Sequence, residues 1–141
     1  MRLVNDHLAT KVRLTEPSDN GFLVVASEVG DWVGPFPMPS RERRRVLTRV
    51  DTLCASLAGN EDVVEAVAFR AALRPPGEGA EILRRGGVRP ARYDVVVLVR
   101  TTTVEAIDTI RANPVYRDMV AVIENAARHI HLLVLVVLLA A

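Results

Sequence analysis

The sequence predicts an α+β domain with the element order β-α-β-β-α-β and a four-stranded antiparallel sheet. Four strand-like segments and two amphipathic helical segments follow one another in this order. Hydrophobic residues make up 50% of the 141 residues, which is enough for one hydrophobic core in a chain of this length. Aromatic residues make up only 4%, so the core is expected to consist of aliphatic side chains.

The first strand of the domain is expected after an N-terminal extension. The extension, residues 1–21, holds a candidate edge strand over 11–15, where polar and apolar residues alternate. The apolar run 22–29 predicts a β-strand, and the glycines and prolines that follow it exclude regular structure up to residue 39. We therefore place the domain at residues 22–141.

A helix is predicted to begin after Ser40 and to end at Ala58. Ser40 is a favourable N-cap, and Gly59 suits the position after the last turn. Four arginines, among them Arg43, lie in the first turns and are expected to form a solvated face. The single cysteine, Cys54, lies on the apolar face and is expected to act as a small buried hydrophobic residue.

Three further strands are predicted in the second half of the chain. They cover 63–73, 93–100 and 130–139, and the last two are apolar on both faces. The helical segment between the third and last strands is expected to bend at Asn113-Pro114, because proline cannot continue a helix.

Several function classes are disfavoured by the sequence. The connection 74–92 holds five arginines but no phosphate-binding fingerprint, and we expect a solvated loop. The net charge of +1 gives no electrostatic argument for nucleic acid. The apolar segment 130–141 has twelve residues, whereas a membrane-spanning helix needs about 20. We therefore expect a cytoplasmic protein without a nucleic-acid or membrane partner.

The predicted element order is the split β-α-β, or ferredoxin-like, plan, in which two helices cover one face of the sheet. Strands 93–100 and 130–139 are apolar on both faces, so the second face of the sheet also needs a cover. A second copy of the same sheet would supply it. We therefore expect a homodimer that is joined through the sheet face.

Residues 22–139 resemble the dimeric α/β-barrel superfamily, which includes stress-responsive A/B-barrel proteins, antibiotic-biosynthesis monooxygenases and muconolactone isomerases. The resemblance is closest between Tyr93 and Leu135. It is carried by Tyr93-Asp94-Val95-Val96-Val97-Leu98, by Glu105-Ala106 in a Thr-capped helix, and by Asn113-Pro114-Val115-Tyr116. The resemblance implies a dimeric barrel with a pocket between the sheet and the helices of each protomer. The Asn, Trp and His of haem-degrading relatives have no residue-by-residue match here, which disfavours haem degradation.

Candidate catalytic and metal-binding residues are polar side chains on or near the predicted strands. His129 and His131 would lie on one side of the last strand, where a metal ion would need a third ligand such as Glu124 or Asp118. The alternative is that the two histidines only mark the junction between helix and strand. We expect neither a metal nor a cofactor. The acid–base candidates, each of which could instead be a strand-end charge in solvent, are Glu28, Arg70, Asp94 and Arg100.

The residues Trp32, Phe36 and Met38 form the densest group of large side chains outside the predicted strands and helices. We predict that they bind a ligand at the lip of an apolar pocket, because ligand pockets are lined mainly by apolar and aromatic side chains. The alternative is that they close the end of the core or lie in the dimer interface.

Three hypotheses about function follow. In the first, the protein is a dimeric α/β barrel that binds a small apolar ligand, or is only structural, and has no catalytic activity. In the second, which the resemblance implies, it is a cofactor-independent monooxygenase, isomerase or cyclase that acts on a small apolar substrate. In the third, it is an interaction module whose C-terminal strand pairs with a partner chain.

Overall fold

The computed structural model describes residues 19–29, 32–33, 38–71, 85–86 and 93–136. Over these ranges the element order is β1-β2-β3-α2-β4-β5-α4-α5-β6. The candidate edge strand at the N-terminus, and nearly all of the loop that was expected before the third predicted strand, lie outside these residues. None of the described helices is long and apolar enough to cross a membrane.

One antiparallel sheet organises the structure. Its strands stand in the order β4-β5-β1-β6. They are β1 (Gly21–Val29), β4 (Val63–Arg70), β5 (Val95–Thr101) and β6 (Ala127–Val136). Every neighbouring pair is antiparallel, so the predicted four-stranded sheet is confirmed.

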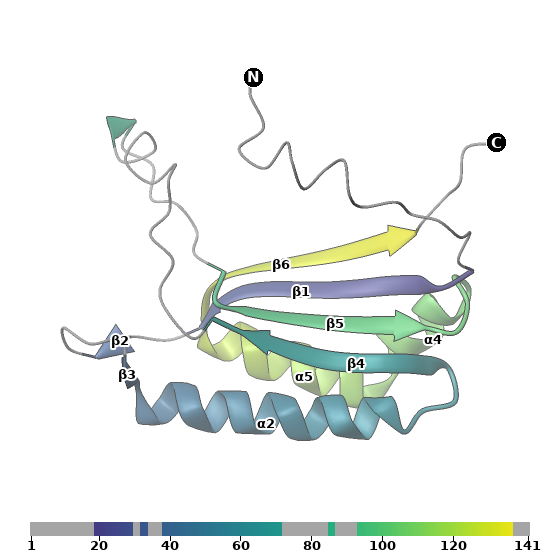
Figure 1. Cartoon of the computed structure of the whole chain (residues 1–141), viewed down its shortest axis with the longest axis horizontal. Coiled ribbons are helices and arrows are strands. Elements are labelled where there is room, and N and C mark those ends of the chain that lie inside the picture. The colour runs from purple at the N-terminus through teal and green to yellow at the C-terminus, as the bar shows by residue number, and fades with distance from the viewer. Residues whose placement is uncertain (1–18, 30–31, 34–37, 72–84, 87–92, 137–141) are drawn as a thin grey trace, which may run out of the picture.

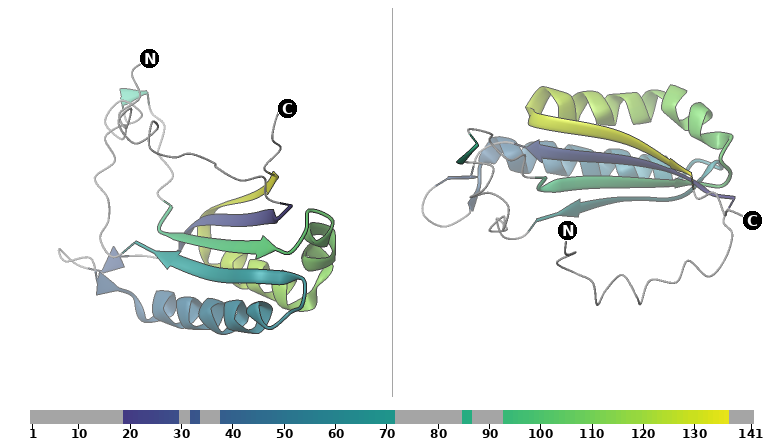
Figure 2. Two further views of the ribbon diagram at one scale, coloured as in Figure 1. Left: turned by 45° about the vertical axis from the view of Figure 1, so that its right-hand side comes forward. Right: turned by 90° about the horizontal axis from the view of Figure 1, so that it is seen from above.

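The helices cover one face of this sheet. The long helices α2 (Arg41–Ala58) and α5 (Pro114–Ala126) run along the strands, and the short α4 (Ala106–Ala112) lies at one end (Figure 1). Figure 2 shows that the helices lie on the same side of the sheet. The other side, which we call the open face, carries no described helix.

The strand register assigns each side chain to one face. Leu23 and Val25 of β1 point toward the helices, opposite Val134 and Leu132 of β6. Their alternate neighbours point to the open face. On the open face lie Phe22, Val24, Ala26 and Glu28 of β1; Val96, Leu98 and Arg100 of β5; Glu65, Val67 and Phe69 of β4; and His129, His131, Leu133 and Leu135 of β6.

The core between the sheet and the helices is aliphatic, as the composition predicts. It contains Val25, Val97 and Val99 from the sheet, Val50 and Leu57 from α2, and Ile110, Met119 and Ile123 from α4 and α5. Cys54 is buried in this cluster, and its Sγ lies 3.7 Å from Sδ of Met119. The prediction that Cys54 acts as a small buried hydrophobic residue is therefore confirmed.

Burial of Cys54 has a consequence for stability at high pH. Desolvation raises the pKa of its thiol above the ordinary value of 9.0, so the unfolded chain releases this proton at a lower pH than the folded chain. Above the pKa of this thiol in the unfolded chain, the free energy of unfolding is therefore expected to fall with rising pH. The contribution of this group is up to about 1.4 kcal/mol per pH unit. Urea denaturation of the protein and of Cys54→Ala at a series of alkaline pH values checks this prediction. The free energy of unfolding should fall less with pH in the variant, and an equal fall in both proteins would contradict it.

Side-chain caps fix the ends of the helices. Ser40 accepts a hydrogen bond from the Arg43 backbone N–H at the start of α2, as predicted. Asn113 ends α4 and begins α5, because its Oδ1 accepts from the N–H of Val115 and Pro114 occupies the first helical position. The predicted bend at this point is confirmed.

The prediction for the last strand needs correction. The apolar run 130–139 suits a strand that is buried on both faces, but β6 is the edge strand of the sheet and pairs only with β1. Within the single chain, each residue from Leu132 to Leu135 is about half exposed. An apolar run predicts that both faces of a strand need a cover, but it does not tell whether the strand is central.

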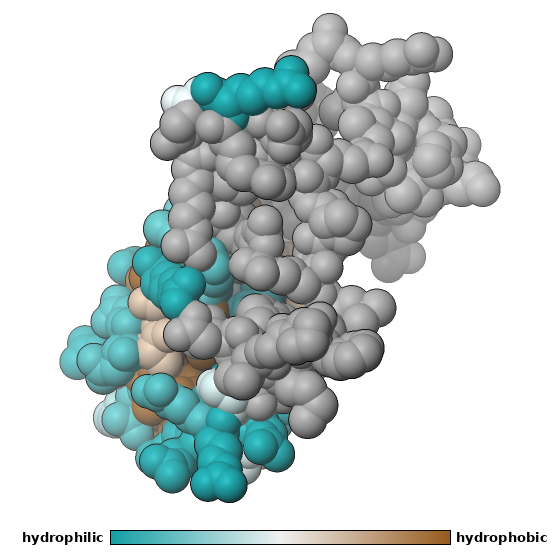
Figure 3. Space-filling model, turned by 90° about the vertical axis from the view of Figure 1, so that its left-hand side faces the viewer, coloured by the Kyte–Doolittle hydropathy of each residue, from teal (hydrophilic) through white to brown (hydrophobic). Residues whose placement is uncertain are grey.

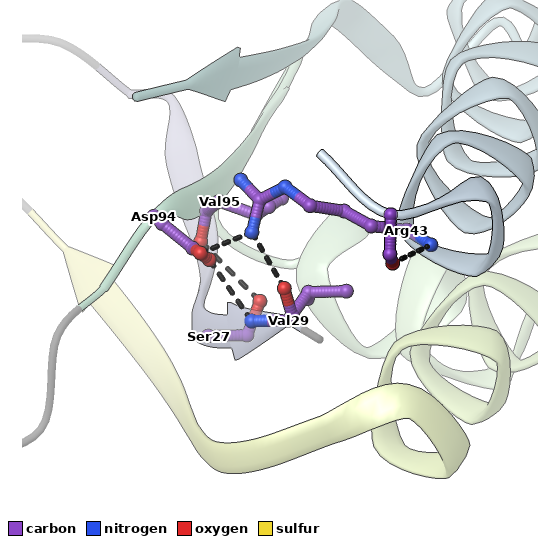
Figure 4. A network of polar contacts seen from close by, with 6 residues as sticks. Ser27, Val29, Arg43, Asp94 and Val95 are labelled. Carbon is purple, nitrogen blue, oxygen red and sulfur yellow. Dashed lines mark hydrogen bonds and ion pairs between the residues drawn. The ribbon is translucent and has the colours of Figure 1, made fainter. Parts of the chain in front are cut away.

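The expectation that Arg43 belongs to a solvated face is also wrong. Its side chain is 2% exposed and forms an ion pair with Asp94, which is 5% exposed. Arg43 also donates from Nη1 to the carbonyl oxygen of Val29 at 2.5 Å, and Asp94 Oδ1 accepts from the N–H of Val29 at 2.9 Å (Figure 4). This network joins α2 to the ends of β1 and β5, and it gives Asp94 a structural role.

Candidate functional site

A groove of about 310 Å³ lies between α5 and the edge strand β6. This volume is at the lower end of the range of ligand pockets, about 300–1,000 Å³. Its apolar lining residues are Leu23, Val120, Ala121, Leu132, Leu133 and Val134, and its polar lining residues are Arg111, Tyr116, Arg117 and Glu124. An apolar wall with a few polar groups is typical of a site for a small molecule.

The groove follows from the periodicity of the two elements that form it. On α5, Tyr116, Val120 and Glu124 are four residues apart and therefore share one side of the helix. On β6, Leu132 and Val134 point toward the helices because they pair with the core residues of β1. No described strand lies beyond β6, so this side of α5 stays uncovered in the described chain.

Tyr116 brings a polar atom into the apolar wall. The residue is 7% exposed, and no residue in the described part of the chain offers its hydroxyl a hydrogen bond. Burial raises the pKa of this phenol, and the positive charge of Arg111 lowers it in part. The hydroxyl therefore stays protonated near neutral pH, and the guanidinium of Arg111 acts on it electrostatically.

Two arginines stand beside Tyr116 at the junction of α4 and α5. Arg117 donates from Nε to the carbonyl oxygen of Arg111 at 3.3 Å, which holds its side chain against the end of α4. Arg111 Nη1 lies 3.5 Å from Oδ1 of Asp108, and both side chains of this pair are more than half exposed. Exposed pairs of this kind contribute little, so a ligand can compete for the Arg111 guanidinium.

The structure brings three of the predicted site residues together, but on the open face and not in the groove. Glu28 is 6% exposed and lies directly opposite His129, while His131 lies opposite Ala26. The ring of Tyr93 meets the ring of His131 edge-on, with 5.3 Å between the centroids. A catalytic role for Glu28, His129 or His131 stays a prediction.

The proposed third metal ligands are not placed beside these histidines. Glu124 lines the α5–β6 groove, and Asp118 pairs with Arg49 of α2 at 3.2 Å. Both belong to the helix layer, on the other side of the sheet from the histidine side chains. The described residues contain no group of three His, Cys, Asp or Glu side chains that could hold a metal ion.

The other charged candidates take part in ion pairs. Arg70 of β4 points toward α2, where it pairs with Asp51 and donates to the carbonyl oxygen of Leu47 at 3.4 Å. Arg100 lies on the open face with Nη2 at 3.8 Å from Oε2 of Glu65. These contacts tie strands to each other or to a helix, and neither arginine lines the groove.

The predicted ligand-binding loop lies at the other end of the sheet from α4. Trp32 belongs to the short strand β2 (Trp32–Val33), and Met38 to β3 (Met38–Pro39), which pairs with it, so the expectation of no regular structure up to residue 39 is wrong at these two short strands. Phe36 lies outside the described residues. Figure 1 shows β2 and β3 at one end of the molecule and α4 at the other. The described surface at the β2–β3 end is mainly hydrophilic, with a smaller hydrophobic area (Figure 3). Ligand contact by Trp32, Phe36 and Met38 stays a prediction.

Comparison with known proteins shows the fold. No protein-family model and no curated protein matches the sequence. A dimeric protein of unknown function and ferredoxin-like fold from Bacteroides fragilis matches with a TM-score of 0.60 and 8% identity, over 86% of this chain and 100% of that chain. The chain has the ferredoxin-like fold.

Two further structural neighbours with this ferredoxin-like fold are enzymes. SnoaB, a cofactor-independent oxygenase from Streptomyces nogalater, matches with a TM-score of 0.55 and 11% identity, over 87% of this chain and 97% of that chain. A hydroxynitrile lyase from Passiflora edulis matches with a TM-score of 0.57 and 9% identity, over 89% and 99% of the two chains. The fold expected from the resemblance is confirmed, and at these identities the likeness extends to the fold alone.

Sequence reasoning missed the polar residues of the groove. Tyr116 belongs to the motif that carries the family resemblance, but neither it nor Arg111 or Arg117 is among the predicted site residues. A usable signal was present: Tyr116 is one of only two tyrosines, and it lies on the apolar side of a helix that begins with Asn113-Pro114. A tyrosine on a buried helix face usually places its hydroxyl near a polar partner or an opening.

Proposed function

We propose that the protein binds a small, mainly apolar molecule in the α5–β6 groove and works as a homodimer joined through the open face. The groove carries this proposal. Its wall is formed by Leu132 and Val134 of β6 and by Val120 and Ala121 of α5, and these apolar side chains are accessible within the chain. A ligand that covers them would remove their apolar surface from water, at about 25 cal/mol per Å².

The dimer rests on the apolar character of the open face. Phe69, Leu133 and Leu135 of this face are each about half exposed within the chain, and Val24 and Leu98 lie between them. Contiguous apolar surface of this kind mostly marks an interface. Structural neighbours from Bacteroides fragilis and Thermobifida fusca are described as dimeric ferredoxin-like proteins, which supports a dimer here.

A second candidate function is catalysis on the bound molecule. It is favoured by the protonated hydroxyl of Tyr116, which forms no hydrogen bond within the described part of the chain and could give a proton or a hydrogen bond to a reacting group in the groove. An oxygenase and a lyase among the structural neighbours support it at the level of the fold. Mass spectrometry of a groove ligand after incubation with the protein separates the two functions, since an enzyme changes the ligand and a binding protein returns it intact.

Filling the groove is expected to weaken ligand binding. Ala121 is exposed on α5 and lines the groove, so Ala121→Trp places an indole there without disturbing the core. With the neutral probe 1-naphthylacetamide, we expect isothermal titration calorimetry to give at least about a tenfold weaker affinity for this variant, because the indole occupies the apolar wall.

The matched control is Ala55→Trp, which adds the same side chain to an exposed position of α2 outside the groove. It should bind the probe as the unmodified protein does. Equal affinity of Ala121→Trp and Ala55→Trp, with both variants folded by circular dichroism, would place the binding site elsewhere.

A further inference from the structure

We infer that the ligand of the α5–β6 groove is an acid, with a carboxylate held by Tyr116, Arg111 and Arg117 and an apolar body that lies along β6. The inference rests on the proposed function and specifies the chemical class of its ligand. It follows from the unequal distribution of polar groups along the groove.

The hydroxyl of Tyr116 is the first of these groups. The residue is 7% exposed and lines the groove, and its hydroxyl forms no hydrogen bond with another described residue. Among the described residues, the one buried side-chain polar atom without a hydrogen-bond partner is Nε of Arg100, so the Tyr116 hydroxyl is open to solvent and can donate to water or to a ligand in the groove. Because burial raises the pKa of Tyr116, the phenol can donate a hydrogen bond over the whole physiological pH range.

The charge beside this hydroxyl is positive. Arg111 lines the same groove, and its positive charge lowers the pKa of Tyr116. Arg117 lies next to it, and its Nε contact with the Arg111 carbonyl leaves the terminal nitrogens of its guanidinium outside that hydrogen bond. Two guanidinium groups and a phenol donor suit a carboxylate, which accepts charge-assisted hydrogen bonds at both oxygens.

The remaining lining residues fix the orientation of the ligand. Val120 and Ala121 follow Tyr116 along α5, and Leu132 and Val134 face them from β6. Glu124, two turns beyond Tyr116, is the acidic lining residue and would repel a carboxylate at its end of the groove. An acid therefore binds with its carboxylate beside Tyr116 and its apolar part toward Val120.

A matched pair of probes tests this inference. 1-Naphthylacetic acid and 1-naphthylacetamide have almost the same shape, but only the acid is charged at neutral pH. We expect isothermal titration calorimetry of the whole protein to show about tenfold or more tighter binding of the acid, because hydrogen bonds to a charged group are about twice as strong as neutral ones. The preference should weaken with added salt, as screening predicts.

Variants connect the preference to the named residues. Arg111→Gln/Arg117→Gln is expected to remove the advantage of the acid while the amide still binds within about twofold of its original affinity. Arg44→Gln/Arg45→Gln, which removes the same charge from exposed positions of α2, should keep the advantage. Tyr116→Phe keeps the buried ring and should weaken binding of the acid more than binding of the amide.

Each outcome separates the inference from the function on which it rests. Equal affinities of the acid and the amide would overturn the acid ligand and leave the apolar groove intact. An advantage of the acid that persists in Arg111→Gln/Arg117→Gln would also overturn it, because the carboxylate would then be bound elsewhere. Failure of both probes to bind would contradict the proposed function itself.

Discussion

Asp94→Asn is expected to lower the free energy of unfolding by about 3–5 kcal/mol, which is a large part of the stability of a domain of this size. Asn keeps the shape of the side chain and an oxygen for the N–H of Val29, but it removes the negative charge beside Arg43. The guanidinium, which is 2% exposed, then loses the negative charge of Asp94 beside it. Urea denaturation followed by circular dichroism measures the loss.

The control for this prediction is an exposed ion pair in the same protein. Asp118 pairs with Arg49, and both side chains are more than half exposed. Asp118→Asn should therefore change stability by no more than about 1 kcal/mol. A loss in Asp94→Asn as small as the loss in Asp118→Asn would show that the Arg43–Asp94 pair does not hold α2 against the strand ends.

Leu98→Glu is expected to convert the proposed homodimer to a monomer. Leu98 lies near the centre of the open face, between Val24 of β1 and Val67 of β4. A carboxylate at this position would be buried without a partner in a dimer, at a cost of several kcal/mol, but it would meet water in the monomer. We expect the dissociation constant to rise at least about a hundredfold, as measured by analytical ultracentrifugation.

Ala55→Glu provides the matched control, because Ala55 is exposed on α2 in the layer opposite the open face. This variant should remain as dimeric as the unmodified protein. A dimer that is unaffected by Leu98→Glu would move the interface away from the open face. An unmodified protein that is monomeric at every accessible concentration would contradict the dimer outright.

The helices and strands could be predicted from the sequence. The strand that lies at the sheet edge and the side chains that pair between distant elements could not. Ser40 and Asn113-Pro114 are local signals, and the helices begin and bend where these residues predict. The position of β6 at the sheet edge depends on the strand order, which the apolar run 130–139 does not contain. Burial of Arg43 depends on a partner 51 residues away, so the local charge pattern alone indicated a solvated helix face.

The candidate site was harder to predict for the same reason. The α5–β6 groove combines Tyr116 and Arg111 with strand residues such as Val134, and no spacing along the chain shows that they line one space. Alternation along the strand correctly placed His129 and His131 on one side, but only the register shows that this side is the open face. The prediction for Trp32 awaits its own test by ligand-dependent fluorescence, which the single tryptophan makes specific.

Nuclear magnetic resonance mapping of the bound neutral probe tests the groove most directly. In a titration of the ¹⁵N-labelled protein with 1-naphthylacetamide, we expect the largest amide shift changes along α5 at Val120 and Ala121 and along β6 at Leu132 and Val134, the residues that line the groove. Shift changes centred on Trp32, or on the open face around Leu98, with none along α5 and β6, would contradict a ligand site in the groove.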